Sequence, residues 1–197
     1  MSKSDPSSSR KERNKTIKWV VTIFLVTIFV SAGISFVSNE LMKMSHVIVA
    51  FVILFIIIFI GILFDVVGVA VTSAEEKPFH SMAARKVQGA QEAIKLLRNA
   101  EKVSSICNDV IGDICGVVSG SASAAIAVQV IAALDSVPSV AITLLMSALV
   151  AGLTVGGKAI GKTFAIQSCT SIVHAAGKVI WTVTHIPALF TKKKNNS

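Results

Sequence analysis

The stretch VIVAFVILFIIIFIGILF, residues 47–64, decides the fold of this chain. It contains no charged or hydrogen-bonding side chain, and the apolar character resumes after Asp65 and continues to Val71. A helix needs about 20 such residues to cross the roughly 30 Å hydrocarbon core of a bilayer. Residues Val47–Val71 therefore predict a transmembrane helix.

Three further apolar runs are long enough to cross a bilayer: Thr16 or Ile17 to Val37, Ile114 to Leu134, and Ser136 to Gly157. Almost all Lys and Arg residues lie in the N-terminal tail, between Lys77 and Lys102, or from Lys158 onward. Cationic segments of this kind stay on the cytoplasmic side of a membrane. The sequence thus predicts an all-α, multi-pass protein of the cell membrane, with about four transmembrane helices and both termini cytoplasmic.

Composition supports the same fold class. Of the 197 residues, 53% are hydrophobic and 15% are charged, whereas a soluble domain carries about 25% charged residues. The predicted organisation is a disordered basic cytoplasmic tail (1–16), one multi-pass membrane domain (17–191) and a basic C-terminal tail (192–197). The net charge of +8 is explained by the positive-inside bias. The expected partner is therefore the lipid bilayer and not a nucleic acid.

The N-terminal apolar run has two interpretations. A basic segment followed by an apolar stretch also occurs in secretory signal peptides. However, this run is longer than the usual signal-peptide core of about 7–15 residues. We expect an uncleaved membrane anchor, with a cleaved signal peptide as the alternative.

Two segments outside the four runs have helical patterns. Between Ser73 and Val103, apolar residues recur at helical spacing among charged ones, which predicts an amphipathic cytoplasmic connector on the inner membrane surface. The stretch after Lys158 is moderately apolar and predicts a C-terminal juxtamembrane helix at the interface. A partial fifth insertion is the alternative for this stretch, although a full crossing would place Lys192–Lys194 outside, against the charge bias.

The third run carries glycine at every fourth position, at Gly112, Gly116 and Gly120. Small residues at this spacing let two helices approach closely within a membrane. We expect this row to form a close helix contact, either inside the chain or across a homodimer.

Polar residues near the cytoplasmic ends of the predicted helices form a candidate metal site, namely Asp65, Ser73, Asn108, Asp109 and Asp113, with Lys158 as an internal charge partner. A charged residue inserted at membrane depth costs about 2.5–3.5 kcal/mol and marks a functional site by default. Carboxylate, amide and hydroxyl oxygens are the ligands that Mg²⁺ prefers. The alternative is that each acid lies at headgroup level, where its charge is solvated.

Two stretches carry a family resemblance. GKAIGKTFA (157–165) resembles the G-E-x-x-P-K-T-x-A pattern of the transmembrane domain of the CorB/CorC and cyclin M (CNNM) magnesium transporters, and LLRNAEKVSSI (96–106) resembles that domain's entry to its second helix. The resemblance covers roughly Val47–Leu189. It implies a dimeric ion-transport protein with Mg²⁺ as the transported ion.

The chain departs from this pattern at three positions. Lys158 stands where the family has Glu, Gly161 replaces its Pro, and Gly68 replaces a Glu of its first helix. No nucleotide-binding CBS domain follows in the sequence. The ammonium group of Lys158 would repel a divalent ion and would instead take the ion's place, paired with Asp65, Asp109 or Asp113.

The sequence leaves two functional classes. The first is a membrane protein of the magnesium-transporter type with an altered or lost ion site. The alternative is a non-transporting membrane scaffold or accessory protein that uses its connector and basic tails. An enzyme is not expected, since the sequence contains no phosphate-binding loop, zinc motif or recognisable nucleophile–base arrangement.

Overall fold

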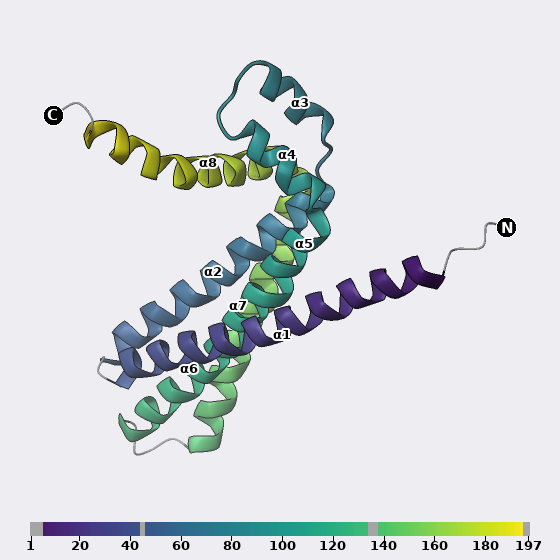
Figure 1. The fold of residues 1–197 in the computed structure, drawn as a ribbon. Coiled ribbons are helices and arrows are strands. Elements are labelled where there is room, and N and C mark those ends of the chain that lie inside the picture. The colour runs from purple at the N-terminus through teal and green to yellow at the C-terminus, as the bar shows by residue number, and fades with distance from the viewer. Residues whose placement is uncertain (1–5, 44–45, 134–137, 195–197) are drawn as a thin grey trace.

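The computed structural model describes residues 6–43, 46–133 and 138–194, and the regular structure within these ranges is helical (Figure 1). In chain order the elements are α1 (Pro6–Lys43), α2 (Val47–Ser73), α3 (Lys77–Ala84), α4 (Ala90–Arg98), α5 (Ala100–Ser104), the π-helical segment η1 (Ser105–Gly112), α6 (Asp113–Ala133), α7 (Ser139–Gln167) and α8 (Cys169–Lys194). Four helical stretches are long and apolar enough to cross a membrane: Thr16–Val37, Val47–Ser73, Ala100–Ala133 and Ser139–Gln167. The predicted all-α membrane fold with four spans is confirmed.

The third and fourth spans are longer than the sequence predicted. The third begins at Ala100 instead of Ile114, because α5, η1 and α6 continue one another despite the polar side chains in η1. The fourth continues past Gly157 to Gln167. Lys158 is therefore an internal residue of α7 and not the first residue after it.

Some predicted boundaries fall near or outside the ends of the described ranges. α1 begins at Pro6, so the chain is helical from there through most of the segment for which a disordered tail was expected (1–16). At the other end, α8 extends to Lys194, into the expected C-terminal tail (192–197). The predicted span ends at Leu134 and Ser136 lie outside the described residues.

α2 is the central helix of the bundle and packs against α6, α7 and η1. In its first half, apolar residues of α2 form a buried cluster with residues of α6 and α7: Ala50, Leu54, Ile58, Ala122, Ile126, Ala127, Ile142, Met146 and Val150. α1 lies at the edge of the bundle and contacts mainly α6. Its residue Ile23 packs against a buried cluster formed by Val110 of η1 and by Ile114 and Val118 of α6. The outward faces of these helices remain apolar and exposed, as expected of surfaces that contact lipid.

The connector is two short helices instead of one amphipathic helix. α3 and α4 are joined by a turn in which Lys86 (φ 57°) and Gly89 (φ 81°) adopt left-handed backbone conformations. This turn folds α4 back onto the end of the bundle. A second buried cluster joins the connector to α2, α7 and α8 and consists of Ala70, Val71, Phe79, Ala93, Ala165 and Val173. We call this end of the molecule the connector end.

α8 docks against the connector instead of continuing the bundle (Figure 1). Gly177 of α8 lies directly against the backbone of Gly89, and His174 Nε2 is 3.1 Å from the carbonyl oxygen of Gln88. α8 is not among the four described stretches that have the length and hydropathy of a span. This arrangement agrees with a juxtamembrane helix.

Candidate functional site

The candidate site is centred on Asp65, in the second half of α2. Its side chain is 5% exposed, because α2 is the central helix and Asp65 faces α7 and η1. A carboxylate at this depth needs a counter-charge or hydrogen-bond donors, since burial of an isolated charge is costly. The surrounding helices supply the counter-charge.

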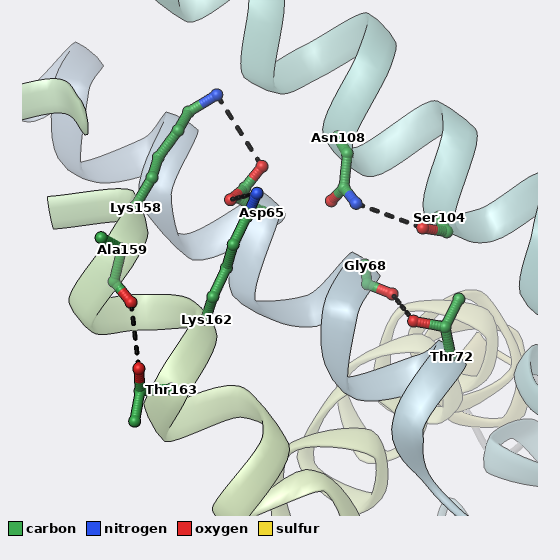
Figure 2. A network of polar contacts seen from close by, with 9 residues as sticks. All are labelled: Asp65, Gly68, Thr72, Ser104, Asn108, Lys158, Ala159, Lys162 and Thr163. Atoms are coloured by element: carbon green, nitrogen blue, oxygen red, sulfur yellow. Dashed lines mark hydrogen bonds and ion pairs between the residues drawn. The ribbon is translucent and has the colours of Figure 1, made fainter. Parts of the chain in front are cut away.

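Two lysines of α7 flank the Asp65 carboxylate (Figure 2). Lys158 Nζ lies 3.7 Å from Oδ1, and Lys162 Nζ lies 3.9 Å from Oδ2. The lysines are one helical turn apart, so both reach the same face of α2. The Lys158 side chain is 22% exposed and that of Lys162 is 54% exposed, so Lys158 is the more deeply buried partner. Each carboxylate oxygen thus faces one ammonium group.

The π-helical segment η1 brings Asn108 against α2 at Gly68, about one turn after Asp65. The Asn108 side chain donates a hydrogen bond from Nδ2 to Ser104 Oγ at 3.2 Å, while Oδ1 is buried and has no hydrogen-bond partner among the described residues (Figure 2). The Oδ1 atom packs directly on Gly68, where any Cβ would overlap it. π-helical turns occur frequently at functional sites because they reposition side chains along a helix.

Gly112, at the end of η1, makes room for the ion pair. A Cβ at this position would lie 3.3 Å from Lys158 Nζ and 3.6 Å from Asp65 Oδ1. By contrast, Gly116 and Gly120 have no atom of the described chain near the position that a Cβ would take. Only the first glycine of the row therefore makes a close contact inside the chain.

The structure brings together only some of the predicted site residues. Asp65, Asn108 and Lys158 lie around one point of α2, whereas Ser73, Asp109 and Asp113 are exposed. Within the described ranges, no three His, Cys, Asp or Glu residues are grouped closely enough to hold a metal ion. Asp65 is the one carboxylate among the residues brought together at this point, and the two ammonium groups beside it oppose a divalent ion. With its lysines in place, this site does not fit Mg²⁺.

Lys162 and Ser104 belong to the site but were missed by the sequence analysis. Lys162 follows Lys158 by four residues, which is the spacing of neighbours on one helix face. Because the predicted fourth span ends at Gly157, the two lysines are not expected to lie on one helix. Ser104 carried no comparable signal, because its role depends on the π-helical geometry of η1.

Comparison of the chain with protein-family models, with curated proteins and with solved structures finds no match.

Proposed function

We propose that this protein is a cell-membrane protein related to the CorB/CorC and cyclin M type of magnesium transporter, with an altered ion site that its own lysine fills. The observation that carries the proposal is the ion pair between Lys158 Nζ and the buried Asp65 carboxylate. Lys158 stands where the resembled family has an acidic residue. An ammonium group there supplies the positive charge that an ion would otherwise bring.

Charge balance is the physical reason for excluding a divalent ion from the wild-type site. Asp65 contributes one negative charge, and Lys158 and Lys162 contribute two positive charges. Two like charges about 4 Å apart repel by about 4 kcal/mol at an effective dielectric constant of about 20, and a divalent ion doubles this repulsion. Removal of Lys158 would leave Asp65 Oδ1 without the ammonium group that it faces now, while Lys162 would remain beside Oδ2.

Thermal unfolding of the purified protein, with and without MgCl₂, tests the proposal. Wild-type protein should show no magnesium-dependent rise in Tm. Lys158→Met should gain such a rise, and addition of Asp65→Asn should abolish it, since a ligand that binds only the folded state raises stability. Stabilisation of the wild type by Mg²⁺ that Asp65→Asn removes would contradict the altered site. Failure of Lys158→Met to respond would remove the support for a latent ion site.

The second candidate function is a non-transporting membrane scaffold, and the docked connector favours it. α3, α4 and α8 share a buried cluster and form a packed platform beyond the spans. A connector that merely linked two spans would not need Phe79 to be fully buried. We place this platform in the cytoplasm, because it carries most of the basic residues of the chain's interior.

We further propose a homodimer through a groove between α6 and α7. The groove encloses about 220 Å³ and is lined mainly by small residues, among them Gly116, Gly120 and Ser123. Ser123 Oγ is buried and has no hydrogen-bond partner in the described chain. Gly116→Leu should convert a dimer to a monomer in light scattering, whereas Gly33→Leu, at an equally open glycine of α1, should not. A monomeric wild type, or a dimer that survives Gly116→Leu, would exclude this interface.

A further inference from the structure

A polar cleft lies between α1 and the start of the third span, away from the site around Asp65. It encloses about 740 Å³ and is lined by Thr16, Lys18, Trp19, Thr22, Glu101, Lys102 and Ser105. α1 diverges from the bundle towards its N-terminal end (Figure 1). In the described structure α1 makes its main contacts with α6, further along the helix.

The position of this cleft places it at the depth of the lipid headgroups. Thr16 begins the first span and Ala100 begins the third, so both walls of the cleft lie where the apolar part of a helix starts. Trp19 lines the cleft, and indole rings prefer the membrane–water interface.

The charge of the cleft favours an anion. Lys18 and Lys102 outnumber Glu101, the one acidic residue in the lining. Lys102 Nζ lies 5.8 Å from the centroid of the Trp19 ring, a cation–π contact that holds the ammonium group over the cleft. The phosphate of a lipid headgroup has the charge and the hydrogen-bonding oxygens to pair with these lysines.

The apolar surface of the first span, which begins at the level of the cleft, indicates a lipid instead of a free phosphate. On another face of α1, a groove of about 650 Å³ runs from Val20 to Ser35. Its lining is mostly apolar and lies within the first span, at the depth of acyl chains. The acyl chains of a lipid whose headgroup lies in the cleft would thus lie at the depth of the apolar surface of the first span.

We propose that the cleft between α1 and α5 binds the headgroup of an anionic phospholipid, with Lys18 and Lys102 as its counter-charges. The bound lipid bridges α1 to the third span at a level where the protein itself provides few contacts. The inference does not depend on the proposed function, because it involves neither Asp65 nor the lysines of α7.

Fluorescence of Trp19 tests the site directly. The chain has two tryptophans, so Trp181→Phe leaves Trp19 as the only one. This variant is reconstituted into two sets of phosphatidylcholine vesicles. Each set contains the same fraction of a lipid that is brominated near the glycerol end of its chains. The brominated lipid is phosphatidylglycerol in one set and phosphatidylcholine in the other. Bromine quenches tryptophan at short range. We expect brominated phosphatidylglycerol to be enriched about fivefold beside Trp19, which corresponds to about 1 kcal/mol per net positive charge.

Matched variants separate the cleft from general attraction by the basic tail. Lys102→Gln should abolish the preference, because it removes a lining cation and leaves the tail unchanged. Lys95→Gln, which removes an exposed charge from α4, should retain it. Equal quenching by the two lipids in the Trp181→Phe protein, in which Lys102 is unchanged, would overturn the proposal. A preference for phosphatidylglycerol that survives Lys102→Gln would also overturn it. Loss of the preference on addition of inorganic phosphate, but not of chloride at matched ionic strength, would overturn the assignment to a lipid.

Discussion

At the scale of single residues, Asp65 organises its surroundings. It is the one charged side chain that is buried within the described part of the chain, and residues of two other elements adapt to it. Lys158 and Lys162 approach from α7, while Gly112 at the end of η1 leaves room for the pair. The lysines of α7 thus neutralise a carboxylate that lies inside an apolar helix. The ion pair fits only because the facing helix has a glycine, Gly112, at this point.

The two lysines should contribute unequally to stability. Lys158→Met should lower the free energy of unfolding by about 3 kcal/mol, because it leaves Asp65 with less compensation in a buried position. Lys162→Met should cost about 1 kcal/mol or less, since Lys162 is largely exposed and solvent screens its charge. Denaturation of the two variants in detergent, each with and without Asp65→Asn, measures both values. Equal losses, or strict additivity of Lys158→Met with Asp65→Asn, would argue against a coupled pair.

At the scale of elements, the connector end depends on two backbones in direct contact. Gly89 has a positive φ that other residues rarely adopt, and a Cβ there would lie 2.5 Å from the backbone nitrogen of Lys178. A Cβ on Gly177 would meet the Gly89 carbonyl oxygen and would lie 2.9 Å from Ala93 N. Backbone atoms cannot rotate away as a side chain can. The docking of α4 on α8 therefore requires glycine on both sides.

Gly177→Ala should separate α4 from α8 while the four spans remain folded. Forced overpacking costs typically about 1–3 kcal/mol, so opening of the connector should increase about fivefold or more. Limited trypsin digestion at Arg85 and Lys86 measures that opening. Gly152→Ala serves as the control, because no described atom lies near its Cβ position. Similar cleavage rates for both variants would show that the contact does not hold the connector.

At the scale of the whole molecule, the bundle has two different ends. The N-terminal end of α1, the connector helices and α8 lie towards one end, and the C-terminal end of α1 and the first turn of α7 lie towards the other (Figure 1). The basic residues gather at the first of these ends. From the positive-inside bias we expect that end to face the cytoplasm.

Cysteine labelling of intact cells should reveal this orientation. With Cys107, Cys115 and Cys169 replaced by alanine, Glu40→Cys should react with a membrane-impermeant maleimide, because residue 40 is exposed beyond the end of the first span. Lys95→Cys should react only after the membrane is permeabilised. Labelling of residue 95 in intact cells would reverse the assigned orientation.

Much of the fold could be predicted from the sequence because membrane spans are a local property. The length and hydropathy of residues 47–64 are sufficient to require a helix that crosses the bilayer, whatever its neighbours are. The same reasoning indicated that Lys158, at the end of a long uncharged run, needs a carboxylate partner. It did not detect the turn at Gly89, since the apolar pattern of the connector is compatible with one helix or two.

Only the tertiary structure decided which polar residues meet. Each residue turns the helix by about 100°, so a carboxylate one position away points to a different neighbour. Packing of α2 against α7 directs Lys158 to Asp65 and leaves Asp109 and Asp113 exposed. The sequence by itself determined the four spans and the need for a counter-charge, because burial in lipid acts on each segment separately. The choice of Asp65 required the rotation of each helix, which depends on side-chain packing across the whole bundle.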